Sequence, residues 1–225
     1  MSKANVTAGQ ARSLIASFVI DTKWDEIDGN IQPFIELPPS ERGEIFVDFL
    51  QEICKRFMFI SITNFFNPAE FFFGESWSIW KGPIDGDGLS GEEDIDSRSL
   101  ALSQIEINKF LFETCLKEGE NSITGEQKLL HLKEKPNFIR FGGNVFFEFW
   151  LDYQAKKENS FLEQVYKKYK ITYLDFFGTI LRGPGGDRNV LCLYRNDDGQ
   201  WSCLYDWLAN DWNADCLSAG CASSA

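Results

Sequence analysis

The cysteines are the first candidates for chemistry in this sequence. Four of the six cysteines lie from residue 192 onward: Cys192, Cys203, Cys216 and Cys221. A structural zinc site needs four ligands in a tetrahedron, and paired cysteines usually have about two to four residues between them. Cys216 and Cys221 meet that spacing, whereas Cys192 and Cys203 would have to meet across a hairpin. These four cysteines are therefore weak zinc candidates. Alternatively, two of them are buried thiols and two are thiols in a C-terminal tail. We expect no cofactor.

A run of acidic residues interspersed with glycine suggests a second kind of site. Asp85-Gly86-Asp87-Gly88 has the spacing of a calcium-loop core, but aligning Gly88 with the invariant glycine puts Pro83, which has no side-chain oxygen, at the first ligand position. We therefore interpret residues 82–96 as an exposed acidic loop. Its carboxylates could instead recognise a basic partner, and the candidates are Asp85, Asp87, Glu92 and Glu93.

Nucleophilic and general-base catalysis have little support. The chain has one histidine, His131, which lies between leucines in a short predicted helix. A Ser-His-Asp or Cys-His arrangement would have to include this residue. We name no catalytic residue and lean against an enzyme, although a catalytic pair among the 34 acidic residues stays open.

The C-terminal third predicts a hairpin with one aromatic face. Residues 189–195 and 200–207 are rich in strand formers, and Asn196 to Gly199 between them is typical of a turn. A four-residue loop would pair Tyr194 with Trp201. Side chains alternate along a strand, so one face would carry Val190, Cys192, Tyr194, Trp201, Cys203, Tyr205 and Trp207. We expect this face to pack in the core. Alternatively, Tyr194, Trp201, Tyr205 and Trp207 contact a ligand or partner.

The elements before this hairpin are mostly helical in pattern. Apolar spacing and capping residues predict helices over residues 7–20, 41–56, 97–117, 124–133 and 160–169, and a further helix that begins at Asn144. Strands are predicted over residues 57–63 and 171–182. We expect an α+β fold whose mostly helical N-terminal two-thirds packs on a C-terminal three-stranded antiparallel meander. Residues 1–225 would form a single domain, and residues 213–225 a frayed tail.

Composition narrows the class of protein. Apolar residues make up 44% of the 225 residues, with 21 Phe and 7 Trp, so the chain can build a core and is not disordered as a whole. A net charge of −12 disfavours nucleic acid and anionic membranes. The sequence contains no apolar stretch long enough to span a bilayer and no convincing signal peptide. We therefore expect a cytoplasmic protein.

Two functions fit this combination. Exposed aromatic residues anchor protein interfaces, and an acidic surface steers basic partners toward itself. The sequence therefore favours a non-enzymatic interaction module, of the inhibitor or immunity-protein type, that binds a basic protein partner. The alternative is a small-molecule-binding protein with an aromatic-lined pocket formed by the hairpin face.

Overall fold

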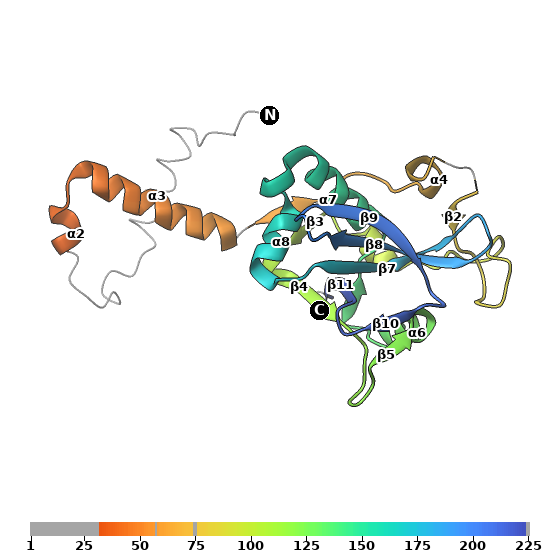
Figure 1. Ribbon diagram of the computed structural model, residues 1–225. Coiled ribbons are helices and arrows are strands. Elements are labelled where there is room, and N and C mark those ends of the chain that lie inside the picture. Colours follow the sequence, from red (N-terminus) through yellow and green to blue (C-terminus); the bar gives the residue numbers. More distant parts are fainter. Residues whose placement is uncertain (1–31, 57, 74–75, 224–225) are drawn as a thin grey trace. The chain divides into compact units, whose positions relative to one another are not determined.

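The computed structural model describes residues 32–223 except 57, 74 and 75 (Figure 1). The chain divides after Glu52 into two compact units. The helix expected over residues 7–20 lies outside the described residues. In the part that is described, no helix has both the length and the apolar character needed to cross a bilayer.

The first unit contributes two helices, α2 (Gln32–Glu36) and α3 (Pro39–Arg56), the second of which runs past the boundary. The helix expected over residues 41–56 is thus confirmed. A hydrogen bond from Arg42 Nη1 to the carbonyl oxygen of Ile35, 3.0 Å long, joins the two helices.

The second unit is built on a seven-stranded mixed sheet. Its strands are β2 (Ser78–Ile79), β4 (Phe110–Glu113), β6 (Phe138–Arg140), β7 (Tyr173–Arg182), β8 (Arg188–Arg195), β9 (Trp201–Trp207) and β11 (Leu217–Ala222). The main order is β4-β11-β7-β8-β9, while β2 pairs with β7 and β6 with β11. The expected fold class is therefore wrong, because the predicted meander β7-β8-β9 is only part of a larger sheet.

The remaining elements are short strands and helices. Two small pairs are formed by β1 (Phe59–Ser61) with β3 (Gln104–Glu106) and by β5 (Ser122–Thr124) with β10 (Asp211–Asn213). The helices are α4 (Pro68–Phe71), α5 (Ser97–Leu100), α6 (Gly125–Lys133), α7 (Gly143–Lys156) and α8 (Phe161–Tyr169), with 3₁₀ turns η2 (Ile107–Lys109) and η3 (Lys157–Asn159).

Two segments depart from their predicted structure. Residues 97–117 form α5, β3 and β4 instead of one helix, because Ile105 pairs with Ile60 of β1 and Phe110 pairs with Cys221 of β11. The expected frayed tail is also wrong, since β11 lies inside the sheet, antiparallel to β4 and β6 and parallel to β7. Sheet pairing across the chain outweighs the local pattern in both segments.

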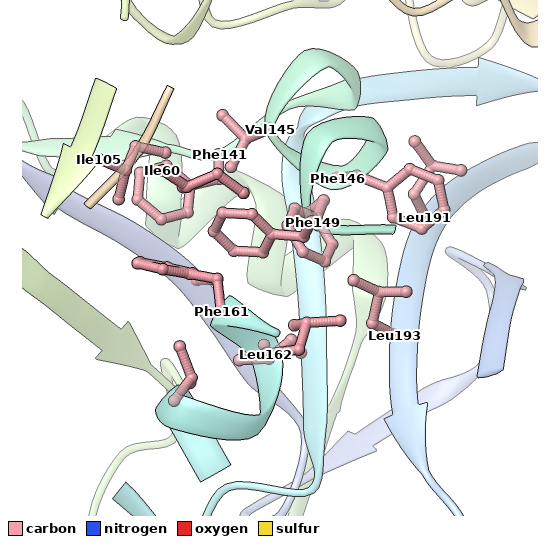
Figure 2. Packing of buried hydrophobic residues seen from close by; sticks show 14 of the residues in the cluster. Ile60, Ile105, Phe141, Val145, Phe146, Phe149, Phe161, Leu162, Leu191 and Leu193 are labelled. Carbon is pink, nitrogen blue, oxygen red and sulfur yellow. The ribbon is translucent and has the colours of Figure 1, made fainter. Parts of the chain in front are cut away.

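The sheet separates two apolar cores. The helices α7 and α8 cover one face, where rings such as Phe146, Phe149 and Phe161 form one apolar cluster with Leu191 and Leu193 of β8 (Figure 2). The other face is covered by α6 and β10, and its core is formed by Trp80, Leu129, Leu132, Phe138, Phe177, Ile180, Val190, Cys192, Leu208 and Trp212. Most of the ring side chains with described positions are therefore buried or half-buried, so the exposed aromatic residues stand out.

Candidate binding surface around strand β9

The predicted hairpin is present, but its register differs by one residue. Arg195 pairs with Trp201 and Tyr194 with Ser202, because the loop spans residues 196–200 and Asn196 N–H bonds the carbonyl oxygen of Gln200. The side chains of Trp201, Cys203, Tyr205 and Trp207 therefore share a face with Leu191 and Leu193. Tyr194 and Cys192 lie on the opposite face, so the predicted common face is wrong.

Two of the four predicted aromatic contact residues are buried or half-buried. Trp201 is 2% exposed, and its Nε1 donates to Glu163 Oε1 at 2.9 Å while its main-chain N–H donates to Tyr153 Oη at 3.0 Å. Tyr194 is half-buried beside Tyr173 of β7. Trp201 thus belongs to the core, and the exposed aromatic residues of β9 are Tyr205 and Trp207, which are 43% and 52% exposed.

Tyr205 lines a large apolar cavity, the aromatic groove. The groove has a volume of about 720 Å³, and its walls come from the segment 65–73, from α7 and from β9. Its lining residues are Phe65, Phe66, Asn67, Glu70, Phe71, Phe72, Phe73, Phe147, Trp150, Leu151, Cys203, Leu204 and Tyr205. Phe65 and Phe73 are 71% and 99% exposed, so part of this aromatic cluster faces solvent. The sequence prediction placed the binding face on the hairpin alone and missed this segment.

Helix α7 holds the groove segment in place through two polar side chains. Glu148 Oε1 accepts hydrogen bonds from the main-chain N–H groups of Thr63 and Asn64, both at 2.6 Å, and from their side chains, both at 2.9 Å. Asn144 Oδ1 accepts from Phe66 N–H at 3.1 Å. Burial alone would raise the pKa of Glu148, but these donors outweigh burial and lower it. The carboxylate is thus a charged anchor for the loop that carries the Phe residues.

Trp207 lines a second and smaller cavity, the acidic pocket. This cavity of about 280 Å³ is lined by Trp80, Ile84, Asp85, Gly86, Glu126, Gly186, Asp187, Arg188, Trp207 and Ala209. It brings together Asp85 of the acidic loop and Trp207 of the hairpin, two predicted contact residues that are far apart in sequence. The two sequence features that suggested a basic partner therefore meet at one place.

The positive charge of Arg188 in this pocket is already balanced. Its guanidinium lies 4.8 Å from the Trp80 ring centre and bonds Asp94 Oδ2 at 3.0 Å and Glu126 Oε1 at 2.7 Å. Burial alone would raise the pKa of Asp94, but Lys133 and Arg188 lower it. Asp85 and Asp187, both exposed, bring additional negative charge to the wall. The pocket therefore suits a cationic group with an apolar stem, because aromatic faces and carboxylates both attract cations.

The other acidic candidates do not line this pocket. Asp87 Oδ1 accepts from Leu89 N–H at 3.0 Å, and Glu93 lies 3.3 Å from Lys81 Nζ. The side chain of Glu92 is exposed. These three acids contribute charge to the loop surface around Asp85.

The register also separates the cysteines proposed for zinc. Cys192 packs in the core beneath α6 and β10, whereas Cys203 packs against the core beneath α7 and α8. Cys216 and Cys221 lie before and within β11. Among the residues with described positions, no group of three or more His, Cys, Asp or Glu side chains could hold a metal ion. The geometry that a four-cysteine site needs is therefore not formed.

A buried ion pair is the polar cluster that sequence reasoning missed. Lys128 Nζ lies 3.2 Å from Asp175 Oδ2 and 2.6 Å from the carbonyl oxygen of Cys216, and Lys128 and Asp175 are both 0% exposed. Asp175 also accepts from Trp212 Nε1 at 2.9 Å and from Cys192 Sγ at 3.2 Å. Burial raises the pKa of the Asp175 carboxyl and of the Cys192 thiol. Because Lys128, Asp175 and Cys192 are fully buried, this cluster fixes α6 to the sheet and presents no reactive group to a substrate.

Comparisons with known proteins add no assignment. The chain matches no family model, no curated protein and no solved structure. The groove and the pocket are therefore the features that indicate a function.

Proposed function

We propose that this protein is an acidic interaction module that binds a basic protein partner through β9 and the two cavities beside it. One observation carries the proposal: Tyr205 lines the aromatic groove, and Trp207, two residues further along the same strand, lines the acidic pocket. Positions i and i+2 of a strand lie about 7 Å apart. We therefore propose that one partner segment reaches both cavities along the edge of β9.

The physical roles of the two cavities differ. Burying apolar side chains against exposed rings contributes affinity, because about 25 cal/mol is gained per Å² of apolar surface removed from water. The acidic pocket contributes selectivity, since it attracts a Lys or Arg and repels an acidic side chain. The net charge of −12 supports the same choice by steering a basic partner toward the surface. The same charge disfavours nucleic acid and anionic membranes as partners.

We further propose that the protein works in the cytoplasm. Cys115, Cys192, Cys203, Cys216 and Cys221 are all free thiols. Free cysteines are typical of reducing compartments, whereas secreted domains usually carry disulfides. Antibodies against the native protein, applied to fractionated cells, would contradict this location if the signal came from the extracellular or periplasmic fraction.

A selection with random peptides tests the proposed function. The full-length chain is used as bait for a random-peptide display library, and the double variant Tyr205→Asp/Phe73→Asp serves as the matched control. Both positions are exposed, so the control should keep the stability of the fold. Enrichment of peptides that combine apolar residues with Lys or Arg supports the proposal. Enrichment of acidic peptides, or equal enrichment on the control, contradicts it.

The groove itself favours a second candidate function. A volume of about 720 Å³ with mostly aromatic walls falls in the range of small-molecule sites, which is on the order of 300–1,000 Å³. A protein that binds a small apolar molecule would use the groove without the acidic pocket. Saturable binding of a neutral apolar dye that is lost in Phe73→Asp but unchanged in Asp85→Lys would favour this alternative.

A further inference from the structure

Strand β9 has a free edge. It ends the sheet order next to β8 (Figure 1), and the main-chain groups of an antiparallel strand alternate between facing the neighbour and facing away. Two hydrogen bonds show which residues of β9 direct their main-chain groups toward β8. Asn196 N–H donates to the carbonyl oxygen of Gln200, and Leu208 N–H donates to the carbonyl oxygen of Arg188. The continuous pairing between them directs the main-chain groups of residues 202, 204 and 206 toward β8. Those of residues 201, 203, 205 and 207 therefore point away from the sheet.

The chain itself closes both ends of this edge. Trp201 N–H donates to Tyr153 Oη at 3.0 Å, and Trp207 N–H donates to Asp206 Oδ1 at 2.8 Å. The carbonyl oxygen of Trp207 accepts from Asn210 N–H at 2.9 Å. Between these ends, the outward N–H and C=O groups of Cys203 and Tyr205 have no hydrogen-bond partner in any other residue whose position is described. The open edge is thus a short window centred on Leu204.

The open window borders the aromatic groove. Cys203, Leu204 and Tyr205 line one wall of this groove, and Phe147, Trp150 and Leu151 of α7 line another. A segment in the groove would therefore lie between a helix and an unpaired strand edge. Pairing of an extended peptide with such an edge supplies main-chain hydrogen bonds, while its side chains fill the adjacent apolar space.

We propose that the partner is bound as an added β-strand, hydrogen-bonded to Cys203 and Tyr205, with apolar side chains in the aromatic groove and a Lys or Arg at the acidic pocket. This inference rests on the proposed function and specifies its binding mode. The pairing is short, because the main chain of Trp207 is already bonded, so the basic residue follows the paired segment and is not part of it.

Two synthetic peptides test this mode. Both alternate Phe with Thr, and a single Arg stands at the N-terminus of one and at the C-terminus of the other. Along β9 the groove at Tyr205 comes before the acidic pocket at Trp207. An added strand that runs antiparallel to β9 therefore requires the N-terminal Arg, whereas a parallel strand requires the C-terminal Arg. Binding to the full-length chain is measured by fluorescence polarisation, and we expect one peptide to bind more tightly than the other.

N-methylation of the better peptide then separates main-chain pairing from side-chain contact. Methylating an amide that faces β9 should weaken binding on the order of tenfold, because it removes a donor and blocks the approach, whereas methylating its neighbours should change binding little. An alternating loss supports strand addition. A uniform response overturns strand addition and leaves the proposed function intact. If neither peptide binds while the display selection still yields basic peptides, strand addition is again overturned alone. If the selection also yields no basic peptides, both proposals fail.

A protein variant provides a matched check. The N–H of Cys203 points away from β8, so Cys203→Pro removes a donor from the open edge without breaking a bond to β8. We expect Cys203→Pro to bind the better peptide on the order of tenfold more weakly than Cys203→Ala, which changes the same side chain and keeps the N–H. Circular dichroism checks that both variants fold, and equal affinity of the two folded variants overturns the proposed mode.

Discussion

Replacing Glu148 with Gln tests the role assigned to the anchor beneath the aromatic groove. The carboxylate accepts from the N–H groups of Thr63 and Asn64, both at 2.6 Å, and from their side chains. Gln has nearly the same shape and keeps one oxygen acceptor. The substitution therefore removes the negative charge while leaving the hydrogen-bonded loop in its position.

The size of the effect follows from the two main-chain bonds. Thr63 and Asn64 are exposed, so their side chains can turn to water, whereas the two N–H groups are held at the carboxylate. A hydrogen bond to a charged group contributes about 1.5–3 kcal/mol and one between neutral groups about 0.5–1.5 kcal/mol. Changing two bonds from the first kind to the second should lower the free energy of unfolding by about 2 kcal/mol.

The effect should also depend on pH in a defined direction. The hydrogen bonds of Glu148 lower its pKa in the folded state, while in the unfolded chain the pKa is about 4.3. A lowered carboxyl pKa stabilises the fold above the unfolded value, and this contribution is lost as the pH falls through the folded value. The difference between wild type and Glu148→Gln should therefore be constant at neutral pH and shrink toward zero below about pH 4.

Urea denaturation followed by tryptophan fluorescence, repeated from neutral to acidic pH, measures this difference. Glu118→Gln is the matched control, because Glu118 is exposed and has no hydrogen bond or ion pair with any residue whose position is described. The control should leave the unfolding midpoint unchanged at every pH. A Glu148→Gln loss that stays the same across the titration, or that equals the control, would refute the charged anchor.

Three further outcomes are expected. Lys128→Met should lower the free energy of unfolding, measured by urea denaturation, by about 3–5 kcal/mol, because it leaves the carboxylate of Asp175 buried without its cation. Adding Asp175→Leu to this variant should recover more than half of that loss. Phe73→Asp should change the melting temperature little, since Phe73 is 99% exposed, yet reduce peptide binding measured by fluorescence polarisation. Gly88→Ala should lower the melting temperature, because Gly88 has φ +74° and a Cβ at this position would lie 2.5 Å from the Trp80 ring. An unchanged melting temperature would mean that this loop is not packed as described.

Elements with local signals could be predicted from the sequence. The helix α6 begins with the predicted capping box, in which Thr124 Oγ1 accepts from Gln127 N–H and Gln127 Oε1 accepts from Thr124 N–H. Ser160 likewise caps α8. The signals of β7, β8 and β9 are equally local, because strand-forming residues and turn residues alternate along the chain.

Strand β11 could not be predicted, because the strands that pair with it lie far away in the sequence. The residues of β11 are mostly small, and a run of small residues without its pairing partners predicts a flexible tail. In the structure a Cβ at Gly220 would lie 2.3 Å from the Phe138 ring and 2.4 Å from the Ile139 carbonyl oxygen, so the close approach of β6 requires a glycine. Only the pairing partner explains that choice of residue.

The candidate site was predicted in part. Asp85 and Trp207 were both named from the sequence, and the structure places them at one pocket. The predicted hairpin register was wrong, because the loop has one more residue than expected. This one-residue shift places Tyr194 and Tyr205 on opposite faces of the sheet. The groove was missed because consecutive Phe residues look the same whether they are buried, as Phe66 is, or exposed.

The position of β11 has a consequence for how the chain folds during synthesis. Both main neighbours of β11, β4 and β7, precede it in the chain, so a ribosome releases them before the strand that joins them. Until residues 217–222 emerge, β4 lacks its sheet partner and β7 lacks a neighbour that it will later have. Unpaired strand edges invite pairing with other chains. A nascent chain arrested before residue 217 should therefore aggregate or occupy chaperones, whereas the released full-length chain should not.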